Sequence, residues 1–219
     1  MSTVTYSIMT RSRFSGLAGL VLTLVFSSLA IPADDTFKLK PANKYPARQK
    51  QDKVTVAVKP FHTDKEIKGA FGKAKPMKHG FLPVLVVINN NSDDALGLED
   101  LMVRFITSDR DGIEPTSAED LAYYQPNTRP KERPRYIPGI PGLNRPKVKK
   151  GPLARPEISS RAFQAPVVPP RSSVGGFFYY QAGTESNPIP GAAIYISGIR
   201  NLNTGRDLFY FEISLDKYR

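Results

Sequence analysis

The chain has 219 residues, of which 40% are hydrophobic and 23% charged, values that are ordinary for a globular protein. It contains no cysteine, which excludes disulfide scaffolds and thiol catalysis. The formal net charge is +11, but the excess lies in residues 36–80 and 126–170, which flank an acidic segment at 81–125. A uniformly basic surface is therefore excluded as well.

The first 33 residues have the organisation of a secretory signal peptide. Two arginines precede an apolar run at residues 14–30, and Ser28 and Ala30 supply the small side chains of a cleavage site, with Ala33 as a second choice. An uncleaved anchor is the alternative, because about 17 apolar residues is the lower limit for a membrane span. A buried helix is the third reading. We expect an extracytoplasmic protein, periplasmic or secreted, or one that this segment anchors to a membrane.

The next residues predict a polar leader and then a strand. Residues 34–52 are polar with little periodicity, so we expect a solvated leader before a single domain at 53–219. In KVTVAVK, Val54, Val56 and Val58 lie on one face and the polar residues Lys53, Thr55 and Lys59 mostly on the other, which predicts a half-buried strand.

Short helices and further strands follow. Thr63 and Glu66 have the spacing of a capping box, which predicts a helix that Gly69 and Gly72 keep short. The continuous apolar run FLPVLVVINN predicts a strand in the middle of a sheet, and LMVRFITS predicts the next strand. Ser117 is placed to cap one further helical turn.

The C-terminal part is rich in strand-forming residues. RAFQAPVVPP, GGFFYYQA, AAIYISGI and DLFYFEISL are separated by short turns such as NLNTGRD. Six or seven short strands with almost no helix predict an all-β, antiparallel sandwich. The residues that we expect in its core are Val54, Val56, Val58, Val84, Val86, Ile88, Phe178, Tyr180, Phe209 and Phe211.

Two of these stretches, VVPPRSSVGGFFYYQ and DLFYFEISLD, resemble the immunoglobulin-like β-sandwiches of secreted bacterial proteins of unknown function. The resemblance covers residues 53–125 and 160–219. It implies an immunoglobulin-like sandwich that acts as a binding or structural module. The long segment between the two parts departs from a compact sandwich.

That segment is a proline-rich basic insertion at about 126–160. Eleven prolines between residues 126 and 170 leave few backbone donors, which predicts an extended polyproline II-like or disordered segment. With Tyr136 as its single early aromatic residue, it lacks a stacking platform for single-stranded nucleic acid. The segment is either a solvated connecting loop or a contact arm. The candidate contact residues of such an arm are Arg129, Lys131, Arg133, Arg135, Tyr136, Arg145, Lys147, Lys149, Lys150 and Arg155.

No catalytic, cofactor or metal site is predicted. His62 and His79 are too few for a zinc site, and no phosphate-binding loop or nucleophile elbow occurs. In SDRDGIEP, three acidic residues surround Gly112 as a calcium ion requires, but Asp-Gly is also a common hairpin turn, and we favour the turn. The three acidic residues of SDRDGIEP are Asp109, Asp111 and Glu114, and the residues that extend this acidic region are Asp93, Asp94, Glu99 and Asp100.

We therefore expect a non-catalytic extracytoplasmic β-sandwich without a cofactor, which binds another envelope protein through the basic insertion. The alternative is a protein that binds a polyanion or a membrane surface, such as acidic polysaccharide or lipid headgroups, through the insertion together with basic residues 36–80. An enzyme is the third possibility. It is the one that we expect least, because no acid, base and nucleophile can be paired. Nucleic acid is not an expected partner of an exported protein.

Overall fold

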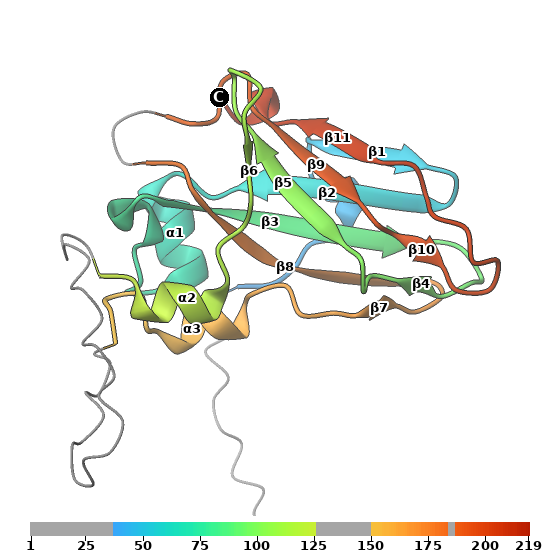
Figure 1. Cartoon of the computed structure of the whole chain (residues 1–219), viewed down its shortest axis with the longest axis horizontal. Coiled ribbons are helices and arrows are strands. Elements are labelled where there is room, and N and C mark those ends of the chain that lie inside the picture. Colours follow the sequence, from blue (N-terminus) through green and yellow to red (C-terminus); the bar gives the residue numbers. More distant parts are fainter. Residues whose placement is uncertain (1–36, 126–149, 184–186) are drawn as a thin grey trace, which may run out of the picture. The chain divides into compact units, whose positions relative to one another are not determined.

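The apolar run at 81–90 forms β3 (Phe81–Asn90), which lies inside a four-stranded antiparallel sheet, as its composition predicts. The computed structural model describes residues 37–125, 150–183 and 187–219 (Figure 1). The expected signal peptide at 1–33 lies outside the described residues. The strand order of this sheet, called sheet A, is β1 (Arg48–Gln51), β2 (Val54–Pro60), β3 and β8 (Ser172–Gln181).

Two further antiparallel sheets and several short helices complete the described chain, so the expectation of an all-β protein is confirmed. Sheet B has the order β10 (Arg200–Asn201), β4 (Leu96–Gly97) and β7 (Val167–Val168), and sheet C has the order β11 (Phe211–Ser214), β9 (Ala193–Ser197), β5 (Met102–Ile106) and β6 (Gly112–Ile113). The helices are η1 (Ala42–Lys44), α1 (Asp64–Phe71), η2 (Pro76–His79), α2 (Ala118–Tyr123), α3 (Pro156–Ser160) and η3 (Asp216–Tyr218).

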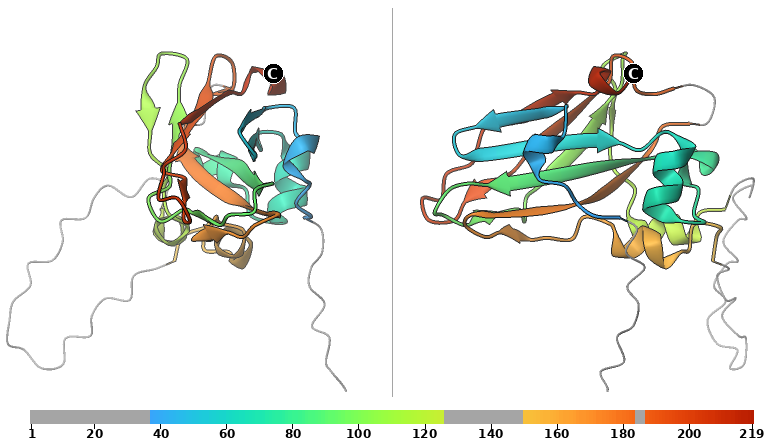
Figure 2. Two further views of the ribbon diagram at one scale, coloured as in Figure 1. Left: turned by 90° about the vertical axis from the view of Figure 1, so that its right-hand side faces the viewer. Right: turned by 180° about the vertical axis from the view of Figure 1, so that it is seen from behind.

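Sheet A is covered on both faces. Alternate residues along β2 and β3 pack against sheets B and C in one hydrophobic core, called core 1, of which Val86 and Ile194 are members. The intervening residues pack against the helices in a second core, called core 2, which contains Leu85 and Phe71. Figure 2 shows α1 and β5 on opposite sides of sheet A. The expectation that β2 is half-buried was therefore wrong, because the helices cover its second face.

The predicted core residues mostly lie where the alternation places them. The six aliphatic residues of β2 and β3, together with Tyr180 and Phe211, are buried in core 1, and Phe178 is partly buried against it. Phe209 is the exception, since 84% of its surface is exposed. The reason is that β11 begins only at Phe211, so the run DLFYFEISL does not continue as a strand through residue 209.

The polar segment before β2 belongs to the fold rather than to a solvated leader. Ala42, Tyr45 and Ala47 are buried, and β1 pairs with β2 along its whole length. The sequence of β1, RQKQ, contains no apolar residue because β1 is an edge strand, which commonly carries polar and charged side chains. Hydrophobic alternation therefore gave no sign of it.

The proline-rich insertion is shorter than predicted, because ordered packing resumes at residue 150. The amide of Gly151 donates a hydrogen bond to the carbonyl of Ala122 over 2.7 Å, and Leu153 and Ile158 are buried in core 2. Pro156 occupies the first turn of α3, a position at which the missing N–H costs no helical hydrogen bond. Here proline begins a helix, whereas we predicted an extended segment.

The predictions of helix caps are confirmed, but the predicted position of one hairpin turn is not. The capping box of Thr63 and Glu66 is present at the start of α1, and Ser117 caps α2. The β5–β6 hairpin, however, does not turn at Asp111-Gly112. It turns at Thr107–Arg110, where the amide of Arg110 donates a hydrogen bond to the carbonyl of Thr107 over 3.1 Å. Arg110 itself has a φ of 70°, as expected at the end of a three-residue hairpin loop.

Sheets A and C are tied together at both edges. On one side, the amide group of Gln51 donates to the carbonyl of Tyr210 over 2.8 Å. On the other side, the backbone amide of Thr116 donates to the carbonyl of Tyr179 over 2.7 Å. Among the described residues, no helix is long and apolar enough to cross a membrane.

Candidate functional site

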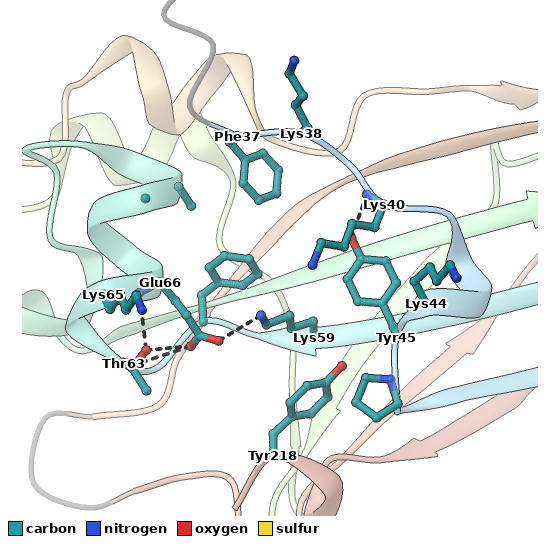
Figure 3. A pocket seen from close by; sticks show the side chains of 14 residues that line it. Phe37, Lys38, Lys40, Lys44, Tyr45, Lys59, Thr63, Lys65, Glu66 and Tyr218 are labelled. Carbon is teal, nitrogen blue, oxygen red and sulfur yellow. Dashed lines mark hydrogen bonds and ion pairs between the residues drawn. The ribbon is translucent and has the colours of Figure 1, made fainter.

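A groove of about 900 Å³ opens over β2, between α1 on one side and the segment around η1 on the other (Figure 3). The C-terminal turn η3 closes its lower end through Tyr218. Its walls combine positive charge with aromatic rings, and we call it the lysine groove. The lysines that line it are Lys38, Lys40, Lys44, Lys59 and Lys65, and the aromatic residues are Phe37, Tyr45, Phe61 and Tyr218.

The start of α1 places one carboxylate in the lysine groove. The Thr63 hydroxyl accepts from the Glu66 amide and donates to Glu66 Oε2 over 2.9 Å, so the capping box fixes the Glu66 side chain. Glu66 Oε1 lies 2.9 Å from Lys59 Nζ. Burial raises the pKa of Glu66, but the hydrogen bonds from Lys59 and Thr63 and the charge of Lys59 lower it by more than burial raises it. The pKa of Glu66 is therefore below its ordinary value. Glu66 is therefore ionised at neutral pH.

Lys59 is the most constrained lysine of the groove. About a quarter of its side chain and of the Glu66 side chain is exposed, at 27% and 26%. Its ammonium group also lies 5.0 Å from the centre of the Phe61 ring, a distance at which the ring face attracts a cation. Lys59 thus extends over the floor of the groove with its charge directed at Glu66.

Three other lysines of the groove have no ion-pair partner among the described residues. Within the described part of the chain, no carboxylate lies at ion-pair distance from Lys40, Lys44 or Lys65. Figure 3 shows the Lys40 side chain directed into the space that Lys59 also faces, whereas Lys38 points away from it. The backbone amide of Lys40 donates to the Tyr45 hydroxyl over 3.2 Å, which holds this segment at the rim.

The floor of the lysine groove is aromatic and continuous with core 2. The Phe37 ring centre lies 5.8 Å from that of Phe61 and 5.2 Å from that of Phe177, and Phe61 contacts Phe177 edge to face at 4.9 Å. Burial raises the pKa of Tyr45 and of Tyr218, so both remain neutral hydroxyl groups. The Tyr218 hydroxyl donates to the carbonyl of Val58 over 2.9 Å.

The two predicted contact residues that the structure describes, Lys150 and Arg155, do not line this groove. Eight of the ten, from Arg129 to Lys149, lie outside the described residues. Lys150 and Arg155 are exposed, and Arg155 is the residue before the first turn of α3. The groove lysines come from the basic segment 36–80, which we expected only as an auxiliary contact. The excess charge of that segment was the available signal, but it does not show which lysines converge.

Three of the nine acidic residues of the 81–125 segment, Asp93, Asp100 and Glu114, form ion pairs with lysine or arginine. Glu114 is bound by Arg104, and Arg171 donates two hydrogen bonds to Asp93 Oδ1, at 2.9 and 2.7 Å. The hydrogen bonds and charge of Arg171 lower the pKa of Asp93. In residues 37–125, 150–183 and 187–219, no three His, Asp or Glu side chains gather closely enough to bind a metal ion.

Comparisons with family models, with curated proteins and with solved structures find no match for this chain.

Proposed function

We propose that the protein is a non-catalytic, exported binding module, and that the lysine groove binds the anionic part of its partner. The observation that carries this proposal is that five lysines line one concave site, with Lys40 and Lys59 facing the same space, and that its lining residues include a single carboxylate. Lysines that are held close together repel one another, and a bound anion relieves that repulsion. A concave site lined by one sign of charge also concentrates oppositely charged ligands near it.

For the fold, we propose an immunoglobulin-like sandwich in which sheets A and C are the two facing layers. The alternation of core 1 residues between these sheets supports the assignment. The helical layer over the second face of sheet A is an addition to such a sandwich, and it provides one wall of the lysine groove through α1.

We propose a binding role rather than catalysis because the groove offers no pairing of nucleophile and base. Glu66 is the acidic residue among those lining it, and Lys59 and Thr63 engage both of its oxygens. A carboxylate held in this way, with a lowered pKa, is a weak base. The lysines then serve as fixed positive charges.

A triple substitution tests the proposal. Lys40→Ala/Lys44→Ala/Lys65→Ala should elute from a carboxylate or sulfate matrix at clearly lower salt than the parent protein, and the slope of log retention against log salt should fall by roughly 2–3. The control is Lys50→Ala/Lys73→Ala/Lys78→Ala, which removes the same charge from exposed positions outside the groove. Equal losses in the two variants would mean that net charge, rather than the groove, determines retention.

A second candidate function is the docking of an envelope protein, which an exposed aromatic patch favours. Phe209 and Tyr210 are 84% and 53% exposed just before β11, and the Tyr210 ring stacks on Tyr195 of the neighbouring strand β9 at 5.3 Å. Exposed aromatic residues frequently supply the main binding energy of protein interfaces. In this proposal the basic proline-rich insertion is a second contact arm.

Two variants separate the patch from the arm. Phe209→Ser should abolish the recovery of one stoichiometric cross-linked partner from envelope fractions, because it removes an exposed apolar contact without touching either core. Replacement of residues 126–149 by a short Gly-Ser linker tests the arm in the same assay, since shortening a long loop changes its closure entropy little. Full recovery of the partner with both variants would refute protein docking at these surfaces.

A further inference from the structure

The lysine groove has two chemical halves. Lysines occupy its rim, whereas Phe37, Phe61 and Ala70 form an apolar floor. From this pairing we infer that the ligand is an amphiphilic anion, with a carboxylate or phosphate head on an apolar body, and that Glu66 competes with its head for Lys59. This inference rests on the proposed function, and it specifies the ligand class and the residue that sets its affinity.

The need for an apolar body follows from the floor. A fully hydrated anion binds lysines without requiring aromatic rings beneath them, whereas an apolar chain gains free energy when it covers apolar surface that still contacts water. On this floor that surface is the partly exposed Phe37 ring, because Phe61 and Ala70 are already buried. Space for a chain exists beside α1, since a Cβ atom built on Gly69 would meet no atom within 4 Å. Lys65 and Glu66 line the groove from the first turn of α1, whereas the later part of the helix lines it with Gly69 and Ala70, which have little or no side chain.

The position of the head follows from the internal ion pair. Glu66 already provides a carboxylate at 2.9 Å from Lys59, held there by the capping box with Thr63. Lys40 is directed into the same space, and no described carboxylate lies at ion-pair distance from it (Figure 3). An incoming anionic head therefore binds between Lys40 and Lys59, where it shares or replaces the interaction of Lys59 with Glu66.

Calorimetric titration with dodecanoate, below its micelle concentration, tests the ligand class. Dodecanoate and dodecyl phosphate should bind at one site, acetate should bind at least a hundredfold more weakly, and dodecyltrimethylammonium should not bind. Equal binding of acetate and dodecanoate, or binding of the cationic amphiphile, overturns the inference.

Substitutions at Gly69 test the location. Gly69→Phe should fill the groove and weaken dodecanoate binding by at least tenfold, whereas Gly69→Ala, which adds one methyl group in open space, should leave it unchanged. Lys40→Ala should weaken binding by about tenfold without altering either core, and it provides the same test if Gly69→Phe does not fold.

Vesicles of phosphatidylglycerol distinguish a bilayer from a free amphiphile. Vesicle binding that survives Gly69→Phe, with no binding of free dodecanoate, overturns the inference.

Glu66→Gln tests the competition. Glutamine preserves the capping box but removes the charge, so dodecanoate should bind about fivefold more tightly. Asp64→Asn removes the same charge from the first turn of α1 at a residue that does not line the groove, and its affinity should stay within about twofold of the parent. Equal effects of the two substitutions refute the role of Glu66. If dodecanoate does not bind but the triple lysine variant still loses retention on the anionic matrix, this inference fails and the proposed function stands.

Discussion

Val86→Asp should lower the free energy of unfolding by about 4 kcal/mol or more, which is enough to prevent folding of a domain of ordinary stability. Val86 is fully buried on the core 1 face of β3, a strand that pairs with β2 on one side and β8 on the other. The aspartate would lie among aliphatic side chains, because Val86 pairs with Val58 across β2 and β3, and core 1 also contains Val84 and Ile194. Urea denaturation followed by circular dichroism measures the loss.

The control for this substitution is Gln181→Asp. Gln181 is exposed at the end of β8, in the same sheet, so the same side chain remains in water there. We expect a change of less than about 1 kcal/mol. A midpoint for Val86→Asp equal to that of Gln181→Asp would show that β3 does not face core 1 as described.

Gly198→Ala should destabilise the protein by roughly 3 kcal/mol or more. Gly198 connects β9 to β10 with a φ of 79°, a conformation that costs an alanine about 1–2 kcal/mol. A Cβ atom at this position would in addition lie 1.9 Å from the carbonyl oxygen of Asp100, which is backbone and has no alternative rotamer. Relieving that overlap requires one of the two chain segments to move, and sheets B and C meet there.

Gly205→Ala separates the two contributions. Gly205 has a similar φ of 69°, but a Cβ atom there would meet nothing within 4 Å. This variant should lose only the conformational contribution, about 1–2 kcal/mol, in the same denaturation experiment. If both glycines lost the same free energy, the close approach of Asp100 would have no energetic effect.

The lysine groove shows why a functional site is harder to predict than a strand. Its residues come from the segment around η1, from β2 and the residues after it, from α1 and from the C-terminal turn, and only the fold places Tyr218 beside Lys59. The sequence shows that residues 36–80 carry excess positive charge. Charge density along a chain does not specify which side chains face a common cavity.

The patterns that the sequence revealed correctly are local. Alternation at Val54, Val56 and Val58, the apolar run of β3 and the capping box at Thr63 each depend on residues within a few positions of one another. The sequence therefore determined the all-β class, the central strand and the start of α1. These features follow from side-chain direction along an extended chain and from the unsatisfied amides of a helix N-terminus.

Only the tertiary structure decided the features that depend on distant neighbours. The polar strand β1 is ordered because β2 pairs with it, and the second face of β2 is buried because the helical layer covers it. Phe209 is exposed because the pairing of β11 with β9 begins two residues later. In each case burial was fixed by the segment that packs against the residue, and sequence periodicity contains no information about that segment.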